Sequence, residues 1–166
     1  MATPSAPWEL SIALYGDGEI FPAPWTFMLH RPGKDDFCDL LYASPWRGVW
    51  MFDIREAVGF EDKVLRHYNG RVKLAMLTDL DRPIVKAIIS GVPIPRPDPN
   101  SPTKEYEEVY KCQYWARNVV AKLVAERKLE PGTTEFVQSL IGKKAVEWPA
   151  IAKEKWFGTL DFPKKR

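Results

Sequence analysis

The first half of the chain alternates apolar and polar residues with the two-residue period of half-buried strands. In residues 8–14, for example, large apolar side chains alternate with Glu9, Ser11 and Ala13. Glycine and proline turns separate this run from the next ones, a spacing that is typical of an antiparallel meander. The pattern therefore predicts strands over residues 8–14, 25–30, 37–43, 49–54 and 71–77.

From residue 81 onward the apolar residues recur at the i, i+3, i+4 and i+7 positions of helices that cover a core. The longest such helix is predicted over residues 112–129, with an apolar stripe that includes Trp115 and Leu123. An earlier start, near Lys104, is compatible with the same pattern. Shorter helices are predicted over residues 81–90, 134–142 and 147–157.

Strands that are followed by helices indicate an α+β fold rather than an alternating α/β fold. We expect a single domain over residues 1–166, in which a curved antiparallel sheet from the strand-rich part (8–77) is packed by the helical part (81–157). Between the first two helices, residues 92–103 carry five prolines, and each restricts its own φ and biases the preceding residue away from the helical region. This segment is predicted to be an ordered, extended loop.

The composition fits a folded domain and indicates neither a nucleic-acid nor a membrane partner. Apolar residues make up 45% of the 166 residues and charged residues 28%, a balance that is typical of globular proteins. The net charge is only +2, with basic and acidic residues spread along the chain, so no nucleic-acid surface is indicated. The sequence shows neither a signal peptide nor an apolar run of about 18 residues. We therefore expect a cytoplasmic protein that spans no membrane.

The cysteines and histidines of the chain do not suggest a metal site. There are two of each, and none are spaced as ligands of one ion would be. We expect Cys38 and Cys112 to be free thiols, because two cysteines are too few for a disulfide framework. The sequence has no glycine-rich phosphate-binding motif, so no cofactor is predicted. The pattern specifies no oligomeric state.

Cys112 is the residue around which a site is predicted. At the start of a helix, a thiol lies near free backbone N–H groups and the positive end of the helix dipole, which both favour the thiolate. Lys111 adds a positive charge beside it. However, Cys112 is also the first residue of the apolar stripe, and free cysteines are among the most buried residues. A helix start near Lys104 would place Cys112 in mid-helix, so a reactive thiol and a packed core residue are both open interpretations.

The motif Cys-Gln-x-Trp at residues 112–115, which opens an amphipathic helix after a block of strands, resembles small fungal proteins. Their fold is similar to the circularly permuted papain-like group, which includes the lecithin-retinol-acyltransferase-like and related peptidase families. The resemblance implies a catalytic cysteine at the helix start and a catalytic histidine on an early strand, directly before Trp25. This chain has Pro24 at that position, and proline cannot act as a base. His30 and His67 are therefore the candidate bases.

Three functions are compatible with these residues. The first is a cysteine-dependent hydrolase or acyl-transfer enzyme for a small organic substrate, with Cys112 as the nucleophile and His30 or His67 as the base. The second is a cofactor-free cyclase or isomerase that shapes its substrate in an aromatic cavity. The third is a non-catalytic binding protein. Whether or not Cys112 is a nucleophile, we expect it to border a small-molecule pocket whose substrate-binding residues are Trp25, Tyr110, Tyr114 and Trp115.

Overall fold

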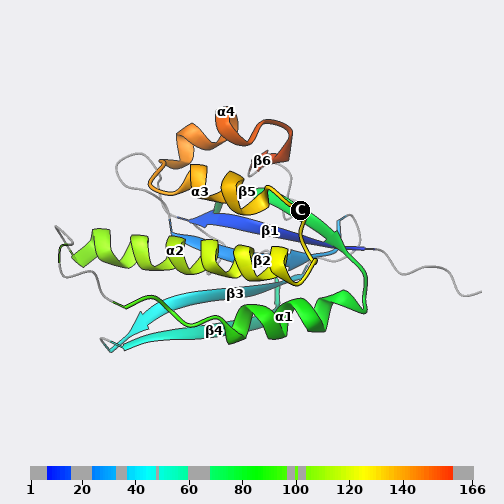
Figure 1. Ribbon diagram of the computed structural model, residues 1–166, viewed down its shortest axis with the longest axis horizontal. Coiled ribbons are helices and arrows are strands. Elements are labelled where there is room, and N and C mark those ends of the chain that lie inside the picture. The colour runs from blue at the N-terminus through cyan, green and yellow to red at the C-terminus, as the bar shows by residue number, and fades with distance from the viewer. Residues whose placement is uncertain are drawn as a thin grey trace, which may run out of the picture.

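The computed structural model describes residues 7–15, 24–32, 37–47, 49–59, 68–96, 100 and 104–158. At its centre is a curved antiparallel sheet with the strand order β4-β3-β2-β1-β5-β6 (Figure 1). This sheet, packed by helices from the second half of the chain, confirms the predicted α+β fold. The strands are β1 Trp8–Tyr15, β2 Trp25–His30, β3 Phe37–Trp46, β4 Val49–Gly59, β5 Tyr68–Leu77 and β6 Trp156–Gly158.

All five predicted strands form, and four of them are longer than the alternation of residues indicated. The largest difference is in β3 and β4, which pair as one long hairpin from Trp46 opposite Val49 to Phe37 opposite Gly59. Pro45 lies beyond the predicted strand 37–43, yet it belongs to β3 and pairs opposite Trp50. Backbone pairing between neighbouring strands therefore carries the sheet beyond the segments that local sequence marks as strands.

The helices agree with prediction in the middle of the chain and differ near its end. They are α1 Asp81–Gly91, α2 Lys104–Ala125, α3 Thr133–Leu140 and α4 Trp148–Ala152, with short 3₁₀ turns at Ala145–Glu147 (η2) and Lys153–Lys155 (η3). The two helices α1 and α3 lie where they were predicted, but α2 begins at Lys104 instead of Cys112. No helix in the described part of the chain is both long and apolar enough to cross a membrane.

The prediction of one helix over residues 147–157 is wrong. Only the short α4 forms, and the chain then continues into β6, which pairs with β5 at the edge of the sheet. Trp156 lies directly against Gly70, where a Cβ atom would come within 2.4 Å of the tryptophan ring. A distant glycine thus makes room for this strand, which local periodicity could not indicate.

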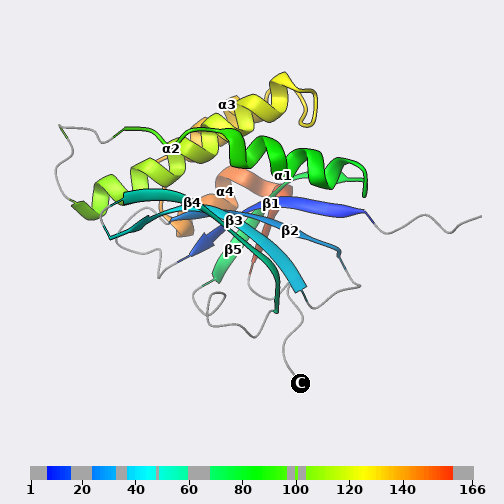
Figure 2. The ribbon, with the colours of Figure 1, turned by 90° about the horizontal axis from the view of Figure 1, so that it is seen from below.

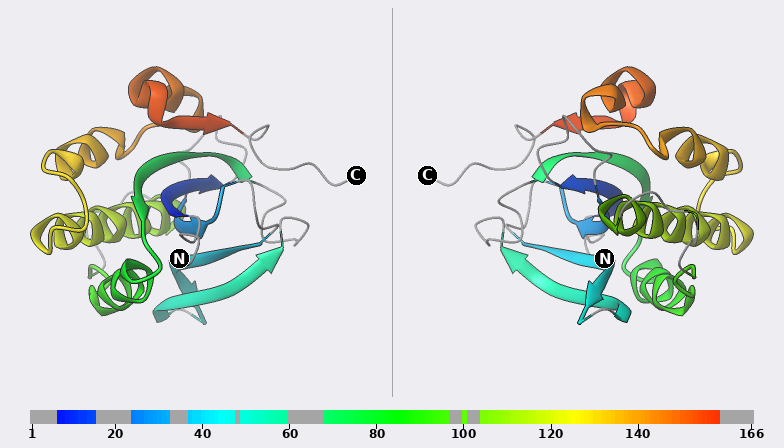
Figure 3. Two further views of the ribbon diagram at one scale, coloured as in Figure 1. Left: turned by 90° about the vertical axis from the view of Figure 1, so that its right-hand side faces the viewer. Right: turned by 90° about the vertical axis from the view of Figure 1, so that its left-hand side faces the viewer.

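Helices α1, α2 and α3 lie on one face of the sheet (Figures 2 and 3). The main core fills the space between them, because the alternating residues of β1 and β2 point their large apolar side chains toward α2. Phe27 meets the ring of Trp115 edge-on at 5.6 Å, and Trp25 meets Trp148 in the same way at 5.2 Å. These three tryptophans therefore help to join the sheet to the helices.

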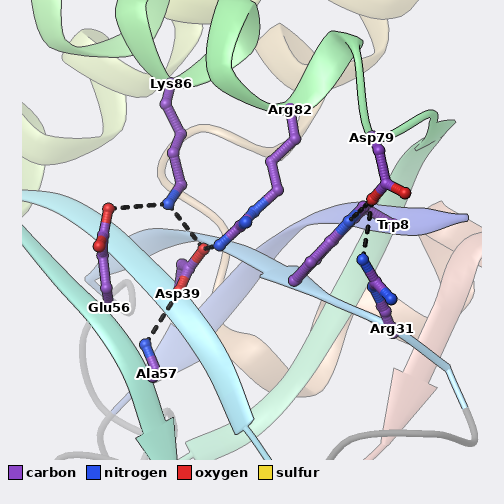
Figure 4. Close-up of polar contacts among 8 residues, drawn as sticks. All are labelled: Trp8, Arg31, Asp39, Glu56, Ala57, Asp79, Arg82 and Lys86. Carbon is purple, nitrogen blue, oxygen red and sulfur yellow. Dashed lines mark hydrogen bonds and ion pairs between the residues drawn. The ribbon is translucent and has the colours of Figure 1, made fainter.

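One carboxylate holds α1 against the sheet (Figure 4). Asp39 on β3 is almost fully buried and forms ion pairs with Arg82 and Lys86, which lie one helical turn apart on α1. It also accepts a hydrogen bond of 3.0 Å from the backbone N–H of Ala57. Burial opposes ionisation of Asp39, but these three donors outweigh it and hold its pKa below the ordinary value. These contacts therefore determine which side of α1 faces the sheet.

Candidate functional site

Cys112 lies within α2, eight positions after its first residue, Lys104. Its Sγ accepts a hydrogen bond of 3.5 Å from the backbone N–H of Trp25 and donates one of 3.1 Å to the carbonyl of Val109. The expected position at a helix N-terminus is therefore wrong, since the N–H groups of the first turn are two turns away. The interpretation of Cys112 as a mid-helix residue agrees with the structure.

The surroundings of Cys112 favour the neutral thiol. Only 4% of the residue is exposed, and burial raises the pKa of the thiol to about 12, although the backbone N–H group of Trp25 acts in the opposite direction. Lys111, which was expected to favour the thiolate, has its Nζ over the ring of Trp50 at 5.0 Å. At neutral pH the residue is consequently protonated and enclosed by protein.

The structure does not bring His30 to Cys112. His30 is the last residue of β2, whereas Cys112 contacts the first, and five residues of strand span about 17 Å. The two side chains also lie on different sides of the sheet, because Leu29 belongs to the helix-facing core and its neighbour His30 points the other way. His67, the other candidate base, lies outside the described residues.

The resemblance to the papain-like group implies a catalytic histidine at position 24. The structure brings this part of the chain to Cys112, because the N–H that reaches the sulfur belongs to the next residue, Trp25. The side chain present there is that of an exposed proline. The residue before Trp25 therefore offers Cys112 no base.

Each of the four aromatic residues predicted to line a pocket packs against another aromatic ring. Trp25 and Trp115 are fully buried in the main core, and Trp115 Nε1 donates a hydrogen bond of 3.1 Å to the carbonyl of Val92. Tyr110 and Tyr114 stack with their ring centroids 5.5 Å apart and are half-buried. Trp115 packs α2 against Phe27 of β2, and Trp25 of β2 packs against Trp148 of α4.

His30 instead belongs to a buried polar cluster on the face of the sheet away from α2. Glu9 Oε1 accepts hydrogen bonds from Arg71 Nε at 2.8 Å and from Ser11 Oγ at 2.7 Å, and Glu9 Oε2 lies 4.0 Å from His30 Nε2. Burial lowers the pKa of His30 to about 4, although the carboxylate of Glu9 opposes this shift. Burial raises the pKa of Glu9, but the hydrogen bond and the charge of Arg71, together with Ser11 and His30, outweigh burial and leave that pKa below its ordinary value. The cluster is closely packed and joins three strands.

A separate cavity lies between α1 and α2. It is an open groove of about 800 Å³, with walls that are almost entirely apolar. The two helices run next to each other along the same face of the sheet (Figures 1 and 2). The residues that line the groove are Pro83, Ile84, Ala87, Ile88, Gly91, Val92, Pro93, Asn118 and Lys122.

The groove follows from the two apolar sides of α1. Val85 and Ile89 are fully buried toward the sheet, on the side that Arg82 and Lys86 hold to Asp39. Ile84 and Ile88 lie on another side of the helix, one turn apart, and Ile84 is 46% exposed. A single helix with two apolar stripes can bury only one of them against the sheet, and the second is left open to solvent.

The polar part of the groove comes from α2 alone. Asn118 and Lys122 are one helical turn apart, so their side chains lie on the same side of this helix. Lys122 forms an ion pair of 3.0 Å with Glu126, in which both side chains are about half-exposed. Asn118 Oδ1 accepts hydrogen bonds from Arg117 Nε at 3.3 Å and Nη2 at 3.0 Å.

Sequence reasoning missed this groove, although one signal was available. The segment 81–91 has apolar residues at positions 84, 85, 87, 88 and 89, which is more than one stripe of a surface helix needs. An apolar helix surface of this width predicts contacts on two sides.

The described residues contain no group of three or more His, Cys, Asp or Glu side chains that could hold a metal ion. No protein-family model matches the chain, and comparisons with curated proteins and with solved structures also found no match.

Proposed function

We propose that this protein is a non-catalytic binding protein that holds an apolar small molecule in the groove between α1 and α2. The observation that carries the proposal is the groove itself, about 800 Å³ in volume and lined mostly by aliphatic side chains. Pockets of about 300–1,000 Å³ with apolar walls and a few polar groups are typical of sites for small ligands. Large contiguous apolar patches on a protein surface often mark sites of interaction or ligand binding.

The alternative of a cysteine hydrolase receives less support from the same structure. Attack on a carbonyl group needs a thiolate and a base within hydrogen-bond reach. Cys112 is enclosed, and burial raises its pKa to about 12, while His30 faces the opposite side of the sheet. A cyclase with an aromatic cavity is likewise less favoured, since the ring of Trp115 packs against Phe27. We therefore propose that Cys112 contributes to the packing of α2.

A fluorescence titration tests the proposed function. The probe is N-phenylnaphthylamine, a neutral apolar dye that becomes brightly fluorescent when it leaves water. We expect saturable binding to the wild-type protein and its loss in Ala87→Trp, because an indole ring on this exposed residue would occupy the groove. Ala150→Trp is the matched control, since Ala150 is exposed on α4 and lies outside the lining.

Cys112→Ser completes the experiment, because a serine hydroxyl can keep both hydrogen bonds of the thiol. The proposal expects this variant to bind the dye as the wild type does. Dye binding that survives Ala87→Trp, or that is lost only in Cys112→Ser, would show that the groove is not the binding site. Circular dichroism melts of every variant verify that each is folded.

A further inference from the structure

We infer that the ligand of the groove between α1 and α2 is an aliphatic carboxylate, a hydrocarbon chain with one anionic head group. The inference rests on the proposed function, because it names the chemical class that this same groove would take. It is based on three features of the lining: the kind of apolar side chains, the hydrogen-bonding groups, and the place of the one charge.

The apolar wall suits a hydrocarbon chain. Its side chains belong to proline, isoleucine, alanine and valine, and no aromatic ring lines the groove among the described residues. Gly91 leaves further room at the end of α1, because a Cβ atom built there would meet nothing within 4 Å. Planar aromatic ligands are usually held by stacked rings, whereas a flexible chain can follow an uneven aliphatic surface.

The polar groups of the lining are donors. The two nitrogen atoms of Arg117 that contact Asn118 can only donate, so the atom facing them must be the amide oxygen. Asn118 is then left with its Nδ2 atom, a donor, for any other partner. The second polar residue is Lys122, whose ammonium group also only donates. Two donors one turn apart and no carboxylate in the lining fit a head group that accepts hydrogen bonds and carries negative charge.

The charge of Lys122 is accessible to such a head group. Its present partner, Glu126, lies one turn further along α2 at 3.0 Å, and the two side chains are 55% and 49% exposed. Ion pairs of this exposed kind hold their partners weakly. A ligand carboxylate whose chain is already buried in the groove would therefore compete with Glu126 for the ammonium group.

Displacement of N-phenylnaphthylamine by three amphiphiles of equal chain length tests the inference. Dodecanoate, dodecanol and dodecyltrimethylammonium are each titrated below the concentration at which they form micelles. We expect dodecanoate to displace the dye at a concentration at least roughly tenfold lower than dodecanol, as one charge-assisted hydrogen bond would give. The cationic amphiphile should be the weakest of the three.

Variants of Lys122 assign the effect to one side chain. Lys122→Gln should lower the affinity for dodecanoate to about that for dodecanol, while Lys122→Arg should keep the preference. Lys143→Gln is the control, because Lys143 is an exposed lysine outside the groove. A preference for dodecanoate that survives Lys122→Gln would overturn the inference.

Other outcomes separate the inference from the function on which it rests. If the dye binds in the groove but dodecanol displaces it as well as dodecanoate does, the ligand class is wrong and the binding function stands. If Ala87→Trp leaves dye binding intact, both fail. Binding of the protein to vesicles of phosphatidylcholine with dodecanoate, without displacement by free dodecanoate, would indicate a membrane surface and would also contradict the inference.

Discussion

Helix α2 carries two regions that differ in almost every physical respect. Around Cys112 the helix faces the sheet, the side chain is 4% exposed, and both hydrogen bonds of the sulfur are made within the protein. Around Asn118 and Lys122 the helix faces an open groove whose apolar wall is supplied by α1. The first region contains the more reactive type of residue, and the second contains the space for a ligand.

This difference shows that a residue type known for catalysis, such as cysteine, does not by itself make a site that a ligand can reach. A thiol is chemically capable only if it can ionise and meet a substrate, and burial opposes both. An aliphatic surface is chemically inert, yet leaving it in water costs free energy that a ligand can recover. For this reason we propose the open apolar groove, rather than Cys112, as the binding site.

The largest expected effect is a difference in the free energy of unfolding between a variant in the core under α2 and a variant in the groove. Leu123 is fully buried on the side of α2 that faces the sheet, so Leu123→Ala should lower the free energy of unfolding by about 2–5 kcal/mol. Ile84 is 46% exposed in the groove, and Ile84→Ala should cost less than about 1 kcal/mol. Urea unfolding of both variants measures the two losses of free energy. Equal losses would mean that the groove is part of the closed core.

A second prediction concerns the support of the groove. Asp39→Asn would leave Arg82 and Lys86 without their buried carboxylate, and we expect a loss of roughly 3 kcal/mol together with weaker dye binding. Glu56 also forms an ion pair with Lys86, but its side chain is 64% exposed. Glu56→Gln should therefore change stability by less than about 1 kcal/mol. If the two variants behave alike, Asp39 does not anchor α1.

A third, smaller effect is a dependence of stability on pH that arises on the far face of the sheet. The pKa of His30 is about 4 in the folded protein, below its value of about 6.5 in unfolded chains. Between these values the unfolded chain binds the extra proton, so stability rises with pH through this window and falls on acidification. His30→Gln should reduce this change, which we expect to be roughly 1–3 kcal/mol.

Urea unfolding of wild type and His30→Gln at several pH values between 4.5 and 7.5 measures that difference. Glu9 and Asp39, whose pKa values lie below the ordinary range, add their own loss of stability at more acidic pH in both proteins. A wild-type protein that becomes more stable on acidification would contradict the assigned state of His30. Dye binding should not follow this transition while the protein is folded, because His30 lies on the face away from the groove.

Much of the fold could be predicted from sequence, because strand alternation and helix periodicity are local. The strand Trp25–His30 and the helix Asp81–Gly91 lie where the pattern placed them. The first residue of α2 was harder to predict, since residues 104–111 are mostly polar and follow a run of prolines. Strand β6 depends on Gly70, more than eighty residues away in the chain, and local periodicity carries no information about such a contact.

The candidate site was less predictable, because it depends on which side of each helix is covered. Cys112 belongs to a sequence motif, but the motif does not reveal that the sulfur meets the N–H of Trp25 from a distant strand. Ile84 and Ile88 resemble ordinary core residues in sequence. Only the packing of α1 beside α2 shows that they border an open groove.

Alkylation of an Ile84→Cys variant by iodoacetamide, followed by peptide mass spectrometry, tests most directly whether the groove or Cys112 is the accessible site. The introduced thiol, Cys38 and Cys112 are then compared in one molecule, and both native cysteines are buried with pKa values raised to about 12. We predict that the introduced thiol at position 84 reacts first in the folded protein. N-phenylnaphthylamine should slow the alkylation of this thiol and leave the alkylation of Cys38 and Cys112 unchanged. Faster labelling of Cys112, or protection by the dye at Cys112 instead of at position 84, would contradict the assignment of the groove as the binding site.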